Sequence, residues 1–88
     1  MEYGDVNRVF HRALGIVEVL YAMKSDLPDG MWSDIKERLG YYVRIHGKDV
    51  SKWSDSVKYD FVEELNSILI DWGFGEIEYE EEEVEQYE

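Results

Sequence analysis

The chain of 88 residues contains no cysteine and only one proline. Without cysteine it forms neither disulfides nor thiolate metal sites, and it is compatible with a reducing compartment. The longest apolar stretch, residues 16–23, is interrupted by Glu18 and is too short to cross a bilayer. The first residues also lack the basic and apolar segments of a signal peptide. We therefore expect a cytoplasmic protein without membrane association.

Basic side chains are scarce and unevenly placed, with nine Lys and Arg against 21 Asp and Glu. The last thirteen residues hold eight of the acids and none of the bases. The chain therefore divides into a mildly acidic domain, residues 1–75, and a strongly acidic tail, residues 76–88. A domain this small lies near the limit of independent stability, and oligomerisation is one common supplement.

The first predicted helix begins at Val6, with Asp5 as its N-cap. Apolar residues recur at helical spacing from there to Met23. They cover about half of the circumference, whereas a surface helix needs a stripe only somewhat wider than about 100°. We therefore expect this helix to be the central one. Apolar faces this wide also predict a homodimer through the first and third helices.

A second helix is expected over residues 31–46, after a turn marked by Pro28 and before a terminating glycine, Gly47. Its second half, residues 41–45, reads Tyr-Tyr-Val-Arg-Ile. These residue types also favour strands, so the sequence leaves helix and strand open for this segment.

The third predicted helix starts after Ser54 and stops at Gly73, with Phe74 placed to pack back on Leu69 in a Schellman motif. Residues 76–79 then alternate polar and apolar side chains, which is the period of a strand. The expected fold is mainly α: a three-helix bundle with a short C-terminal extended segment and an acidic tail.

An acidic surface is the main candidate for an interaction site. Clustered carboxylates attract a basic protein partner, and one version of such a module is an inhibitor that mimics nucleic acid. The same charge repels DNA phosphates, so direct DNA binding is not expected. The carboxylates lie on the predicted outer face of the third helix and in the tail: Asp60, Glu63, Glu64, Asp71, Glu80, Glu81, Glu82 and Glu83.

Apolar side chains interrupt the acidic tail and are candidates for docking it to a partner. They are Ile77, Tyr79, Val84 and Tyr87. The alternative is a tail that only keeps the helical domain dispersed, and such a tail needs no aromatic residues. The sequence therefore favours a non-enzymatic interaction or adaptor module that engages a basic partner.

A second hypothesis is a ligand-binding or catalytic domain with a pocket at a dimer interface. The predicted apolar face of the second helix places Trp32, Tyr42 and His46 beside such a pocket. His46 would serve there as a general base, and the alternative is a partly buried histidine at the helix C-terminus. Neither histidine has metal-ligand or catalytic partners at a recognisable spacing. We therefore expect no metal, no cofactor and no enzymatic activity.

The composition resembles that of small acidic proteins from hyperthermophilic archaea. Cysteine is absent, glutamine occurs once, and charged residues make up 34% of the chain. The resemblance implies a thermostable protein and points to no particular function.

Overall fold

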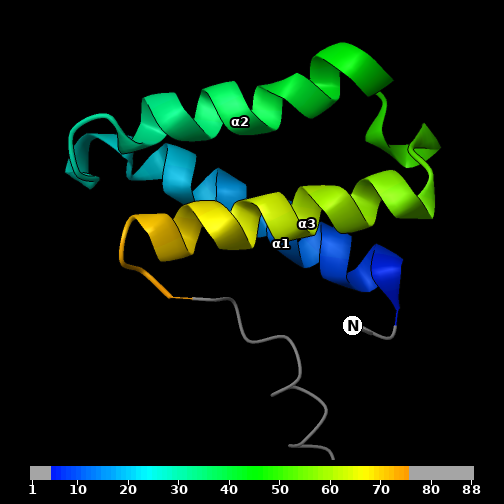
Figure 1. Cartoon of the computed structure of the whole chain (residues 1–88), viewed down its shortest axis with the longest axis horizontal. Helices are drawn as coiled ribbons and strands as arrows, with labels where there is room; N and C mark the ends of the chain where they lie inside the picture. Colours follow the sequence, from blue (N-terminus) through cyan, green and yellow to red (C-terminus); the bar gives the residue numbers. More distant parts are fainter. Residues whose placement is uncertain (1–4, 76–88) are drawn as a thin grey trace, which may run out of the picture.

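The structure, a computed structural model, describes residues 5–75, which form three α-helices and two short 3-10 helices. α1 spans Val6–Ala22, α2 spans Met31–His46 and α3 spans Asp55–Asp71, while η1 (Lys24–Asp26) and η2 (Val50–Lys52) lie in the connections. Residues 5–75 contain no strand, so the predicted three-helix bundle is confirmed for them (Figure 1). The extended segment expected at residues 76–79, and the rest of the tail, lie outside the described residues.

The predicted helix starts are confirmed by side-chain caps. The Asp5 carboxylate accepts hydrogen bonds from the backbone amides of Asn7 at 3.0 Å and Arg8 at 3.4 Å. The Ser54 hydroxyl accepts one from the amide of Val57 at 3.2 Å. Each cap satisfies backbone donors that have no partner within the helix.

The C-terminus of α3 has the hydrogen bonds of a Schellman motif. The Phe74 amide donates to the Leu69 carbonyl at 2.7 Å, and the Gly73 amide donates to the Ile70 carbonyl at 3.0 Å. Gly73 has a φ of +85°, a left-handed conformation that glycine adopts without steric cost. Phe74 itself stays 52% exposed.

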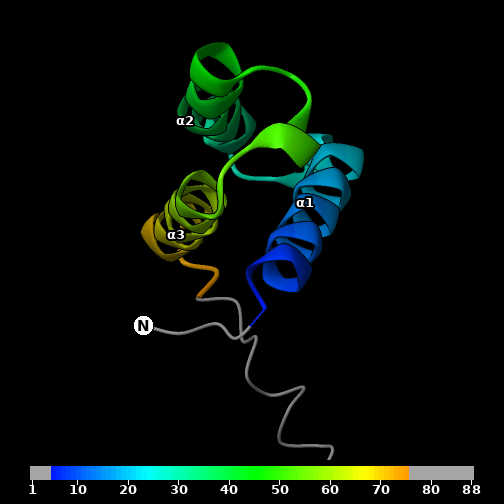
Figure 2. The same cartoon turned by 90° about the vertical axis from the view of Figure 1, so that its right-hand side faces the viewer.

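The central helix is α3, and the expectation that the first helix is central is wrong. α3 packs against both α1 and α2, and the three helices form a triangle in end view (Figure 2). α1 turns only part of its wide apolar surface towards α3, and Val19 and Tyr21 remain 60% and 55% exposed. The sequence shows how wide an apolar face is, but not which part of it a neighbour covers. The homodimer stays a prediction.

The second half of α2 is helical, which settles the alternative left open for residues 41–45. The Tyr42 ring packs edge-on against Phe61 of α3 with 5.9 Å between ring centroids. The helix then closes at Gly47, whose amide donates to the Val43 carbonyl at 2.9 Å. Packing against α3 therefore outweighs the local strand propensity.

An aromatic cluster joins the N-terminal ends of α1 and α3 to the α2–α3 connection. Phe10, Trp53 and Phe61 lie with ring centroids 5.4–5.8 Å apart and are all buried. The Trp53 indole donates to the Gly47 carbonyl at 3.1 Å, so its polar atom is satisfied. Offset and edge-on contacts of this kind add to the stabilisation from burial alone.

No helix within residues 5–75 has the length and apolar character that a membrane span requires.

We expect Phe61→Asp to unfold the protein, because the substitution removes a ring that is 4% exposed and buries an unpaired charge. The matched control is Phe74→Asp, where the ring is half exposed and the charge stays hydrated. Circular dichroism during heating measures both. A melting temperature for Phe61→Asp equal to that of the parent would contradict the placement of this ring in the core.

Candidate interaction surface between α2 and α3

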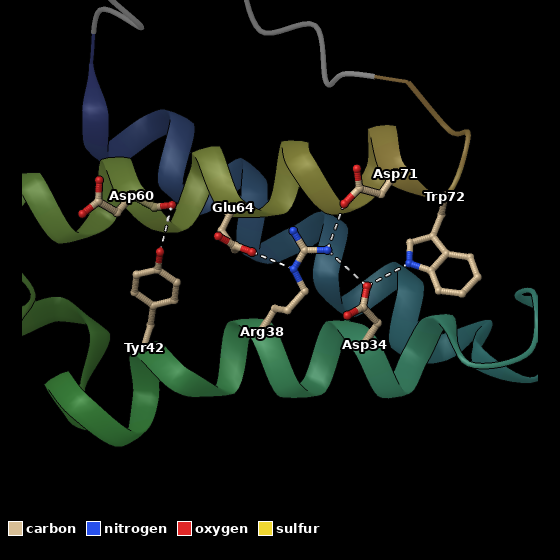
Figure 3. A network of polar contacts seen from close by, with 7 residues as sticks. All are labelled: Asp34, Arg38, Tyr42, Asp60, Glu64, Asp71 and Trp72. Atoms are coloured by element: carbon tan, nitrogen blue, oxygen red, sulfur yellow. Dashed lines mark hydrogen bonds and ion pairs between the residues drawn. The ribbon is translucent and has the colours of Figure 1, made fainter.

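One arginine of α2 joins three carboxylates across the α2–α3 interface (Figure 3). Arg38 Nε donates to Glu64 at 2.7 Å, and its Nη1 contacts Asp71 at 3.1 Å and Asp34 at 3.2 Å. We call these four residues the Arg38 network. Asp34 lies one turn before Arg38 on the same helix, whereas Glu64 and Asp71 come from α3. The network therefore links the two helices along their facing sides.

Asp34 also accepts a hydrogen bond from a residue at the end of α3. The Trp72 indole donates to the same carboxylate oxygen that faces Arg38, at 2.9 Å. Trp72 is the C-cap residue of α3, so this contact ties the end of α3 to the first turn of α2. The Asp34 carboxylate is thereby held in one orientation by two donors.

The charge of the network is unbalanced. Three carboxylates surround one guanidinium, which leaves a formal charge of −2 around it. The hydrogen bond to Glu64 raises the pKa of Arg38 above its ordinary value, burial opposes this shift, and Asp71 and Asp34 add to it. Arg38 therefore stays charged at any physiological pH, and the excess negative charge remains at the surface.

Tyr42 extends the surface one turn further along α2. Its hydroxyl donates to the backbone carbonyl of Asp60 at 3.5 Å, a long and weak hydrogen bond (Figure 3). Burial raises the pKa of Tyr42, and the negative charges of Glu64 and Asp60 raise it further. The phenol is therefore held in its neutral form.

A shallow groove of about 560 Å³ runs over this part of the molecule. It combines two tyrosine rings with charged side chains of both signs. Its lining residues are Asp34, Glu37, Arg38, Tyr41, Tyr42, Arg44 and Glu64.

The structure does not present the four predicted acids of α3 as one outward face. Asp60, Glu63 and Asp71 are exposed, but Asp71 pairs with Arg38 of the neighbouring helix, as does the partly buried Glu64. The reason is that α2 packs on the side of α3 that carries Glu64 and Asp71, and only the tertiary structure shows this. The predicted partner-binding acids of the tail, Glu80 to Glu83, and its docking residues Ile77, Tyr79, Val84 and Tyr87 lie outside the described residues.

The residues of the hypothetical pocket are only partly brought together. Tyr42 and His46 stack with 6.4 Å between ring centroids, and His46 also lies 6.1 Å from Trp53. Trp32 packs instead against Tyr21 of α1, at 5.5 Å. It precedes Tyr42 by ten residues of helix, which is about 15 Å. His46 is exposed, and of the three residues only Tyr42 lines the groove.

Sequence reasoning missed the residues that organise this surface. The spacing of Asp34 and Arg38, four positions apart on one helix, was a signal for their ion pair. Nothing local links Arg38 to Glu64 or Asp71, which lie 26 and 33 positions away. Lys58 was likewise unexpected in the interior, where its amine donates to the Asn7 side chain at 2.6 Å.

Within residues 5–75, no group of three or more carboxylate or histidine side chains is arranged to hold a metal ion. No protein-family model matches the chain, and no curated protein or solved structure matches it. Function is therefore inferred from the residues themselves.

We expect Arg38→Met to lower the free energy of unfolding by about 1–2 kcal/mol, because three carboxylates are left facing one another without a cation. The loss should be larger at low salt, where their repulsion is less screened. Lys36→Met, an exposed position on the same helix, is the control. Urea unfolding at two salt concentrations measures both, and an equal, salt-independent effect of the two changes would contradict the role of Arg38.

We expect the protein to lose stability above about pH 10 through Tyr42. Because its folded-state pKa lies above the ordinary value of about 10, its contribution is complete below that pH and is lost as the pH rises through the folded-state pKa. Tyr42→Phe should lose less stability than the parent between about pH 9 and pH 11. Urea unfolding across this range measures it, with about pH 8 as the reference where no difference of this kind is expected. An equal alkaline loss in both proteins would contradict the assignment.

Proposed function

We propose that the protein is a non-enzymatic interaction module that binds a basic protein segment. The observation that carries the proposal is the Arg38 network, in which three carboxylates face one guanidinium and keep a formal excess of two negative charges. Because Arg38 and Trp72 already orient these carboxylates, a cationic partner meets a preformed surface and pays little entropy to order it.

The tyrosines of the groove suit a partner that is rich in arginine. Tyr41 is 50% exposed and Tyr42 is partly buried, and both line the groove beside Glu37. A guanidinium or ammonium group is attracted to the face of such a ring as well as to a carboxylate. The groove therefore supports binding of basic side chains, with the acidic tail as a second, sequence-derived contact.

The titration behaviour of the surface supports binding rather than proton transfer. A general acid or base works best when its pKa lies near the working pH. Arg38 and Tyr42 both have raised pKa values, so both are held further from neutrality. One version of the proposed module is a mimic of nucleic-acid phosphates that occupies the basic site of a nucleic-acid-binding protein.

The proposal is tested with a fluorescently labelled oligo-arginine peptide and fluorescence anisotropy. We expect saturable binding whose affinity falls by about tenfold or more between about 0.1 M and 1 M salt, because the screening length shrinks from about 10 Å to about 3 Å. Glu37→Gln should weaken binding, because it removes a carboxylate of the groove. Glu18→Gln, an exposed glutamate on α1, is the matched control and should bind as the parent does.

Two results would count against this function. One is no saturable binding of oligo-arginine at low salt. The other is equal weakening by the Glu37 and Glu18 substitutions, which would show attraction to net charge without a defined surface.

A further inference from the structure

The C-terminal end of α2 and the connection after it are basic, in contrast to the rest of the chain. Residues 44–54, which we call the basic end, contain three bases and one acid in a protein with a formal charge of −12. The acid is Asp49, whose Oδ2 lies 4.0 Å from Lys52 Nζ, a weak ion pair in which both side chains are largely exposed. The bases are Arg44, Lys48 and Lys52.

Apolar side chains are exposed beside these bases. Tyr41 and Ile45 keep 50% and 59% of their surface accessible. Since residues three and four positions apart share a helix face, Tyr41, Arg44 and Ile45 form one continuous strip. The Arg44 guanidinium lies over Gly40: a Cβ atom added at Gly40 would be 3.7 Å from Arg44 Nη1. The strip therefore offers both charge and apolar surface to a partner.

We propose that the acidic tail, residues 76–88, docks on the basic end and its apolar strip in the same molecule. The tail has the complementary composition: eight carboxylates, no base, and the apolar side chains Ile77, Tyr79, Val84 and Tyr87. The basic end combines an excess of positive charge with exposed apolar residues next to it. The tail and the basic end are therefore complementary both in charge and in apolar surface.

The length of the tail is sufficient to reach this surface. α2 and α3 run in opposite directions, and the end of α3 lies beside Asp34, which hydrogen-bonds to Trp72 (Figure 1). Arg44 is ten residues beyond Asp34, about 15 Å along the helix. Five to eight extended residues after Gly75 span about 16–29 Å, which brings residues 80–83 to the level of Arg44.

Docking within one molecule is favoured over docking on a second copy. A short tether holds the tail at an effective concentration of about 1 mM, above the micromolar concentrations of most solution experiments. Each exposed ion pair is weak, so the docked tail can be displaced. A basic partner that takes the tail would then release the basic end. This last step rests on the proposed function, whereas the docking itself does not.

The docking is tested in the full chain by NMR. The four tail residues Glu80, Glu81, Glu82 and Glu83 are changed together to Gln, and backbone amide shifts are compared with those of the parent. Within residues 5–75, we expect the shift changes to concentrate at Tyr41, Arg44, Ile45 and Lys48. As salt is raised, the amide shifts of the parent at these residues should approach those of the variant. The shift pattern should be the same at low and high protein concentration.

Two outcomes overturn the proposal. If the amides of residues 41–48 do not respond to the four substitutions, the tail does not dock there. If they respond only at high protein concentration, the tail docks on a second copy. Arg44→Glu is the reciprocal change and should remove the response, whereas Lys36→Glu on the same helix should preserve it. Arg44→Glu that leaves the response intact would also overturn the proposal.

A lysine variant outside the groove separates this proposal from the proposed function. With the tail released, Lys48→Glu should bind oligo-arginine about threefold or more tightly than Lys36→Glu, which adds the same charge, a change equivalent to the loss of one or two exposed ion pairs. Peptide binding without any response of residues 41–48 would support the proposed function and overturn the docking. A response of residues 41–48 without peptide binding would support the docking and count against the proposed function.

Discussion

The charged edge of the α2–α3 interface depends on one cation, Arg38, which lies among three carboxylates. α2 brings Asp34 to the interface, and α3 brings Glu64 and Asp71. Without Arg38 these carboxylates would repel one another across a partly buried seam, where water screens charge less than at an open surface. Arg38 offsets the repulsion with a planar group that contacts all three, a geometry that lysine could not reproduce. Ile35 of α2 and Leu65 of α3 are buried in the core, so burial of apolar surface stabilises the packing of the two helices and Arg38 removes the repulsion at its partly exposed edge.

The same constraint leaves the surface around Arg38 with a net negative charge. A cluster with equal numbers of cations and carboxylates would carry no net charge to attract a cationic group. A cluster of carboxylates without a cation would destabilise the contact between the two helices by repulsion. Three carboxylates around one guanidinium lie between these limits. The remaining negative charge is oriented by Arg38 and Trp72, and it borders a groove with two tyrosine rings. Cationic side chains of a peptide interact favourably both with carboxylates and with aromatic rings, so this surface suits the proposed binding of a basic peptide.

The distribution of charge along α2 gives the molecule two unlike ends. Asp34 and Glu37 lie in the first half of the helix together with Lys36 and Arg38, whereas the second half holds Arg44 and no acid and is followed by Lys48. A cation is favourable at the negative end of the helix dipole, and carboxylates are favourable near the positive end. This arrangement stabilises the helix and leaves its C-terminal end, with the connection after it, as a basic segment that borders the groove. It is also the basis for the proposed docking of the acidic tail on the basic end of its own chain.

The elements of the fold follow from local signals in the sequence, and their arrangement does not. The caps at Asp5 and Ser54 and the Schellman motif at Gly73 were predictable, because each is decided by residues within one turn. The identity of the central helix was not, because an apolar face on α1 looks the same whether a neighbour covers it or solvent does. The helical state of residues 41–45 needed Phe61 of α3 as a packing surface for Tyr42.

The sequence by itself determined the number of helices, where they begin and end, and the acidity from which a basic partner is proposed. Only the tertiary structure decided how the acids of α3 are placed relative to α2. Glu64 and Asp71 looked equivalent to Asp60 and Glu63 in the sequence, since all four lie on one side of α3 at helical spacing. Contact with Arg38 holds Glu64 and Asp71 against α2, and of these two only Glu64 is partly buried. The physical reason is that ion pairs between distant segments depend on how helices pack, and packing is set by the whole core rather than by any local pattern.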